Sequence, residues 1–166
     1  DVNAPLTANI VHLVAGGDIN QASSAPVSAS GLLAVSNAGS VYLDGANNSV
    51  DVIAGRAVNE FYFANNKSLT VGTVGGVSGI TAENANGAAL VSLELNGAGS
   101  SSLYVSKDIK AIGGDGSTGI YLDINATYGG NITVTNATMS AIRCAGCMPL
   151  ARTSTESRST RLMAAL

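Results

Sequence analysis

Apolar and polar residues alternate in short stretches along most of this chain. The commonest unit is an apolar residue, a variable residue and a second apolar residue, followed by small or Asn- and Gly-rich positions. Alternation with period two buries one face of a strand, and the sustained spacing of an amphipathic helix is missing. The pattern predicts an all-β chain with strands at Leu33/Val35, Val41/Leu43, Val50/Val52, Phe61/Phe63, Leu69/Val71, Leu93/Leu95, Leu103/Val105, Ile120/Leu122 and Ile132/Val134.

Turn-forming sequences separate these strands, roughly one strand for every ten residues. Examples are Gly45–Asn48, Asn84–Gly87 and Gly113–Gly116. Two folds have this rhythm: a parallel β-helix, in which short strands stack coil upon coil, and an antiparallel β-sandwich.

Four tyrosines favour the β-helix. Tyr42, Tyr62, Tyr104 and Tyr121 each lie between two apolar residues, at intervals near multiples of 20. Stacked coils repeat side chains at a fixed interval, whereas a sandwich has no reason to do so. We therefore expect a solenoid with coils of about 20 or about 30 residues, and Asn side chains that bond along the stack at its corners. The antiparallel sandwich stays the alternative.

The charge of the chain is low and slightly negative. Charged residues make up 11% of its 166 residues, Trp is missing, and the formal net charge is -3. Nucleic-acid binding needs a basic stripe and stacking aromatics, so we expect no nucleic-acid partner. Apolar runs fall short of the ~18 residues of a membrane span, so we expect no membrane span, and we expect no signal peptide among these residues. Because it begins at Asp1, we interpret it as a processed form or an excised piece.

Several segments resemble filamentous haemagglutinin-like proteins, the exoproteins of bacterial two-partner secretion. Residues 15–21 (Ala-Gly-Gly-Asp-Ile-Asn-Gln) are similar to a phrase that recurs in that family. The other similar segments are residues 40–44, 58–61, 66–72 and 78–82. The resemblance covers about residues 10–82, whereas residues 83–138 share only the general repeat pattern of the family.

This resemblance implies a right-handed parallel β-helix over residues 1–142, exported to the bacterial cell surface or the medium. It also implies a role in adhesion. The low charge and the missing Trp fit a non-catalytic element that acts as a rigid stalk and adhesive surface, and with a single His we expect no cofactor or metal. The partner would be a host surface glycan or protein. Strand alternation points Tyr42, Tyr62, Tyr104 and Tyr121 outward. They are either strand residues that stack on neighbouring coils, which is the favoured interpretation, or contacts for the partner. Open solenoid ends would also favour self-association.

An alternative function is that of a carbohydrate-active β-helix, a polysaccharide hydrolase or lyase. Asp44, Asp51 and Asp123 are its candidate acids, since such enzymes use two or three carboxylates on one outer face. An Asp at a strand end more often caps a turn. Lys107 and Lys110 are the nearest candidate basic partners in sequence, beside Asp108.

Other motifs have plainer interpretations. Residues 113–119 resemble one imperfect copy of a calcium-binding nonapeptide, but such sites need tandem copies, so we expect a Gly-rich turn. His12 is the single histidine and lies in a strand-like run, which favours an edge residue over a general base. Asn-x-Ser/Thr sequons make five asparagines candidate glycosylation sites: Asn47, Asn66, Asn125, Asn131 and Asn136.

The composition changes after residue 142. Residues 143–166 hold four of the eight basic residues and both cysteines, Cys144 and Cys147. The Cys pair has half the ligands of a zinc site, so a disulfide or free thiols are expected instead. We interpret this segment as an atypical basic tail: a cap over the last coil, a disordered end, or a stretch foreign to the repeat.

Overall fold

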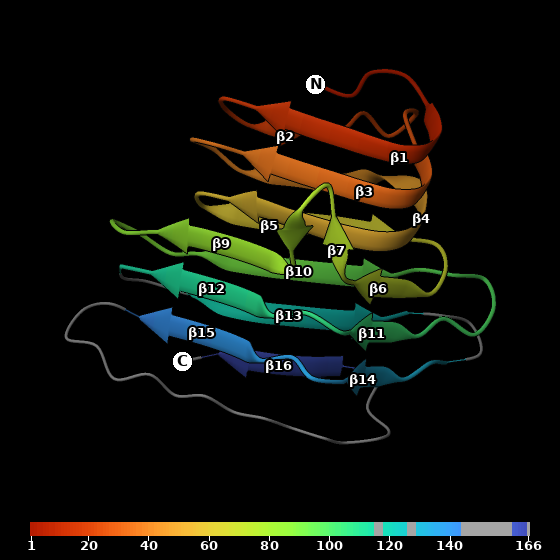
Figure 1. Ribbon diagram of the computed structural model, residues 1–166. Helices are drawn as coiled ribbons and strands as arrows, with labels where there is room; N and C mark the ends of the chain where they lie inside the picture. The colour runs from red at the N-terminus through yellow and green to blue at the C-terminus, as the bar shows by residue number, and fades with distance from the viewer. Residues whose placement is uncertain (115–117, 126–128, 144–160, 166) are drawn as a thin grey trace.

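The computed structural model describes residues 1–114, 118–125, 129–143 and 161–165, and these residues form strands and turns without a helix (Figure 1). The strands lie in two faces of a folded sheet, here called the front and back sheets. The front sheet contains β1 (Leu6–Ala15), β3 (Val27–Ser36), the second part of β4 (Val41–Ala57), β6 (Leu69–Val71), β9 (Ile80–Asn84), β11 (Leu103–Val105), β12 (Ile109–Gly113), β14 (Ile132–Val134) and β15 (Met139–Arg143). The back sheet contains β2 (Ile19–Asn20), the first residues of β4, β5 (Glu60–Asn65), β10 (Leu90–Leu95), β13 (Gly119–Ile124) and β16 (Arg161–Ala165).

Successive coils stack on one another with parallel strands. The chain runs along the front sheet, returns along the back sheet and steps to the next coil, so it winds right-handed (Figure 1). Strand β4 serves two coils, because residues 41–43 pair with β2 and β5 whereas residues 49–56 pair mainly with β3. The predicted all-β parallel β-helix is confirmed, and the sandwich alternative is not the fold.

Coil length changes along the stack. In the early coils the register steps from Leu6 to Val27 and from Val41 to Phe61. In the later coils the steps are longer, from Leu90 to Gly119 and from Ile109 to Met139. The front strand of these later coils is divided in two, as in β11 and β12, and the turns are longer. Both coil lengths expected from the sequence therefore occur, the shorter one first.

Inward-facing apolar side chains fill the stack. Each occupies the same register position as its counterpart in the next coil, so the core is built from columns. Two columns on the back sheet, at most 2% exposed, are Val41, Phe61, Val91 and Ile120, and Leu43, Phe63, Leu93 and Leu122. Burying one such side chain contributes roughly 1.5–3 kcal/mol, so the columns are the main source of stability.

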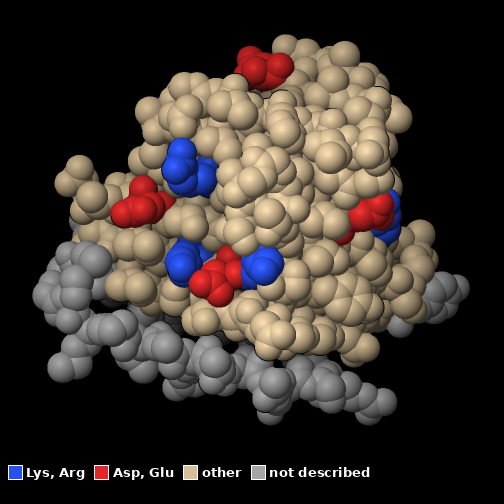
Figure 2. Space-filling model, in the orientation of Figure 1, with Lys and Arg blue, Asp and Glu red and all other residues tan. Residues whose placement is uncertain are grey.

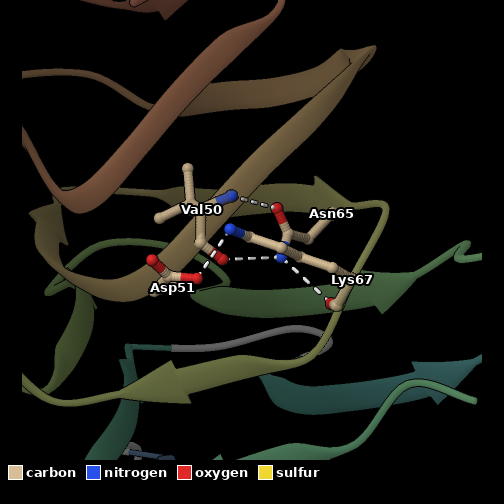
Figure 3. Close-up of polar contacts among 4 residues, drawn as sticks. All are labelled: Val50, Asp51, Asn65 and Lys67. Carbon is tan, nitrogen blue, oxygen red and sulfur yellow. Dashed lines mark hydrogen bonds and ion pairs between the residues drawn. The ribbon is translucent and has the colours of Figure 1, made fainter. Parts of the chain in front are cut away.

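Buried amides close the corner that leads from the back sheet to the front sheet. Asn48 Oδ1 accepts hydrogen bonds from the Val27 amide and the Gln21 side chain, at 2.8 and 2.6 Å. Asn65 bonds both backbone groups of Val50, at the start of the same coil (Figure 3). The sequence predicted Asn at the corners, and these side chains satisfy backbone groups that the strands leave unpaired.

The motif at residues 15–21 forms the opposite corner of the first coil. Asp18 Oδ1 accepts a hydrogen bond of 2.7 Å from the Ser40 amide, one coil further on. Gly39 packs so tightly on Asp18 that a side chain at this position would clash. The Asp of the motif therefore has a structural role between coils.

A hairpin covers the outside of the front sheet. It consists of β7 (Thr73–Val74) and β8 (Val77–Ser78), and in Figure 1 it rises across β4 and β3. Val74 is 5% exposed and packs with Leu33, Val35 and Ala54 in a second apolar cluster. Leu33 and Val35, which marked a predicted strand, are buried but do not face the main core. Leu32 and Ala34 point there, and the hairpin buries the other two from outside. Figure 2 shows this face, on which charged side chains are few.

The last described strand runs against the direction of the others. Backbone pairs from Gly119↔Ala165 to Asp123↔Arg161 join β16 to β13 in antiparallel order. This places part of the predicted basic tail at the edge of the last back-sheet strand. Cys144 and Cys147 lie outside the described residues.

Candidate binding surface

Three of the four candidate tyrosines form one column on the outside of the back sheet. The register aligns Tyr42 with Tyr62, Tyr62 with Ser92, and Ser92 with Tyr121. All three rings are half-buried, as expected for outward positions. Tyr104 lies elsewhere: it is 46% exposed on the front sheet, aligned with Thr70 and Thr133.

Tyr42 and Tyr62 stack on each other, with ring centroids 5.7 Å apart and planes inclined by 27°. The Tyr42 hydroxyl donates a hydrogen bond of 2.7 Å to Glu60 Oε2. A hydrogen bond with Ser40 lowers the pKa of Tyr42, but the bond to Glu60 and burial outweigh it and raise that pKa overall. Burial, followed by Glu60, Tyr42, Asp44 and Tyr121, raises the pKa of Tyr62. Both phenols are thus held neutral in a negatively charged setting.

Carboxylates border this column on both sides. On β5, Glu60 lies two residues before the column residue Tyr62. On β10 and β13, Glu94 and Asp123 lie two residues after the column position, and these two carboxylates are paired in register. Asn125 Nδ2 donates a hydrogen bond of 2.9 Å to Glu94 Oε1, which holds that carboxylate. The outer face of the back sheet is therefore aromatic along its middle and acidic at its margins.

The three acids of the enzymatic alternative are spread over the structure. Asp44 and Asp123 occupy comparable strand ends in coils three steps apart. Each step between neighbouring strands is about 4.8 Å, so three of them exceed the ~9.5 Å between the most widely spaced glycosidase carboxylates. Asp51 lies on β4 and forms an ion pair of 2.6 Å with Lys67 (Figure 3). Asp44, Asp51 and Asp123 are therefore not neighbours in this structure.

A polar hollow of about 420 Å³ lies on the front sheet below the hairpin, lined by Ser78, Thr81, Lys107, Asp108, Lys110 and Asn136. Asp108 accepts a hydrogen bond of 2.9 Å from the Thr138 amide and pairs with Lys110 at 3.1 Å. The Thr138 amide, followed by Lys110, lowers the pKa of Asp108. These contacts give Asp108 the role of a turn cap.

The remaining candidates are placed as follows. His12 is exposed on β1, and a side chain added at Gly75, in the hairpin turn, would meet its ring. In the glycine-rich turn, the Gly114 amide donates to the Asn84 and Gly87 carbonyls, whereas residues 115–117 lie outside the described part. Within the described residues, no three His, Cys, Asp or Glu side chains are close enough to hold a metal.

Four of the sequon asparagines lie at turns or strand ends, and Asn47 lies inside β4. Asn47, Asn125, Asn131 and Asn136 are exposed, and Asn66 is half-buried. Glycosylation at these positions stays a prediction.

Sequence reasoning missed Glu60 and Ser92, because their place beside the tyrosines depends on the coil register. One signal in the sequence could have found Ser92. Like the tyrosines, it lies between two apolar residues, Val91 and Leu93, and it follows Tyr62 by the length of one of the longer coils.

Comparison with known proteins gives no relative: no family model, no curated protein and no solved structure matches this chain. Among the described residues, no helix has the length and apolar character needed to cross a membrane.

Proposed function

We propose that this chain is a non-catalytic structural and adhesive segment of a secreted bacterial surface protein. In this role it resembles the repeat segments of filamentous haemagglutinin-like exoproteins. Its coils form a stiff spacer, and its outer faces meet a host surface glycan or protein.

The tyrosine column on the back sheet supports this proposal most directly. Tyr42 and Tyr62 present aromatic surface from a backbone that is held by parallel pairing on both sides. Rigid, partly exposed aromatics are favourable contact residues because little side-chain freedom is lost on binding. The surrounding carboxylates add polar contacts at the margin.

Bead adhesion tests the proposal. Beads coated with the purified full chain are added to cultured epithelial cells and to immobilised matrix proteins, and retention under flow is measured. We expect retention above that of albumin-coated beads, reduced by Tyr62→Ala and unaffected by Tyr104→Ala, with thermal melts to verify folding. Retention no better than albumin contradicts the proposal.

The enzymatic alternative has a separate test. The full chain is incubated with a panel of polysaccharides, and reducing ends and unsaturated products are measured. We expect no cleavage, consistent with the separation of Asp44 from Asp123. Cleavage that disappears in Asp44→Asn or Asp123→Asn contradicts the non-catalytic role.

A further inference from the structure

The tyrosine column has a gap. Ser92 occupies the position between Tyr62 and Tyr121, on the middle one of three adjacent back-sheet strands. Its neighbours Val91 and Leu93 are fully buried, so Ser92 points outward as the tyrosines do. A small side chain therefore stands where the pattern of the column would place a ring.

The strand of Ser92 is one strand spacing from the strand of Tyr62 and one from the strand of Tyr121. Neighbouring strands lie about 4.8 Å apart, so the backbones that carry Tyr62 and Tyr121 are separated by two such steps. A group held over Ser92, midway between these two strands, is therefore one step from each strand. That step is inside the ≈ 6 Å limit at which a cation is attracted to an aromatic face.

Among the side chains that the structure describes, those charged near the gap are acidic. Glu94 lies two residues from Ser92, and Asn125 holds its carboxylate in place. Glu60 and Asp44 both act electrostatically on Tyr62, at the upper side of the gap. A positively charged group is favoured here by the ring faces and by the carboxylates together.

We propose that the gap at Ser92 binds an organic cation, the ammonium or guanidinium group of a Lys or Arg side chain from a basic segment of a partner protein. This deepens the proposed adhesive function, on which it rests. A protein segment is the favoured source because the acidic margin runs from Asp44 in the second coil to Asp123 in the fifth. Three steps of about 4.8 Å make a margin longer than a single cationic head group needs.

Filling the gap tests the proposal. The peptides acetyl-Gly-Arg-Gly-amide and acetyl-Gly-Glu-Gly-amide, and tetramethylammonium chloride, are titrated into the full chain and followed by NMR. We expect saturable binding of the Arg peptide at roughly millimolar concentration, with shifts at Tyr62, Ser92 and Tyr121, and no saturation by the Glu peptide. Ser92→Tyr completes the column and should weaken Arg-peptide binding about tenfold.

Matched variants separate the site from general effects. Ser92→Ala keeps the gap and should bind as the original chain does, as should Tyr104→Ala on the front sheet. Glu94→Gln should bind more weakly, and added salt should weaken binding in the original chain. A thermal melt of Ser92→Tyr shows that loss of binding is not loss of fold.

Each contrary result has a distinct meaning. Unchanged binding in Ser92→Tyr, or equal binding of the Arg and Glu peptides, overturns the cation site. Tighter binding of tetramethylammonium than of the Arg peptide overturns the protein source. Bead retention without Arg-peptide binding rejects the gap and leaves the adhesive function standing, whereas peptide binding without retention rejects the adhesive function.

Discussion

The Asn65 side chain pairs with both backbone groups of Val50, at the start of the same coil. Oδ1 accepts a hydrogen bond from the Val50 amide and Nδ2 donates one to the Val50 carbonyl, each at 2.9 Å. Nδ2 also donates to the Lys67 carbonyl, and the residue is 1% exposed. One side chain thus satisfies three backbone groups at this corner.

Asn65→Ala is expected to destabilise the fold by about 2–4 kcal/mol, because it leaves the Val50 amide and carbonyl without partners. Urea denaturation of the full chain measures the effect. Asn96→Ala, at an exposed position one coil later, is the control and should leave stability nearly unchanged. Equal stability of the two variants would show that the corner amide is dispensable.

Val74→Ala should loosen the hairpin that covers the front sheet. Removing two methyl groups from this buried residue costs about 1–2 kcal/mol and uncovers Leu33 and Val35. Val14→Ala makes the same substitution at a site 63% exposed and should be nearly neutral. Urea denaturation gives both values, and amide hydrogen exchange of Leu33 should accelerate only in Val74→Ala. Unchanged exchange there contradicts a covering role.

We predict that the contribution of Asp108 to the free energy of unfolding is lost in acid. Its pKa lies below the ordinary value of 3.8, because the Thr138 amide and Lys110 favour the carboxylate. Its contribution is therefore complete above about pH 4 and is lost as the pH falls through the lower pKa of the folded state. Asp108→Asn should be less stable than the original chain at pH 7, and the difference should shrink by about pH 2.5. Denaturation midpoints measured across that range check this, with Glu83→Gln as the control for removal of a charge. A constant difference would contradict the assignment.

We predict that the chain self-associates at high concentration through the unpaired edge of strand β1. It forms the edge of the front sheet, and Ile10 on its outer face is 55% exposed. Sedimentation velocity should show oligomers that grow with concentration, and Ile10→Lys should reduce them, because a charge at a strand edge opposes pairing. Tyr104→Lys, the control, replaces an exposed apolar residue away from this edge. Monomers at high concentration would refute the prediction.

The sequence predicted the fold well where one face of a strand packs and the other meets solvent. Phe61 and Phe63 point inward and Tyr62 outward, as period-two alternation requires. The alternation was misleading at Leu33 and Val35, where both faces of the strand are buried. The sequence of β3 alone does not show that the β7–β8 hairpin covers it, because that contact joins segments far apart in the chain.

The candidate surface was predictable only in part. The four tyrosines were expected to recur at a fixed interval on the outside of the stack, and Tyr42 and Tyr62 are neighbours there. The interval rule misplaced Tyr104, because the later coils carry a divided front strand and the interval from Tyr62 to Tyr104 no longer returns to the same column. Ser92 could be recognised only once the register was known, since nothing local distinguishes it from other strand serines.

The hairpin also has a mechanical consequence. A pulling force on the N-terminus acts first on β1, which pairs with β3 alone among the described strands. Because Val74 packs on β3 and β4 together while Gly75 reaches His12 on β1, the hairpin couples these three strands, so they must yield together. It would therefore act as a shear clamp at the narrow end of the solenoid.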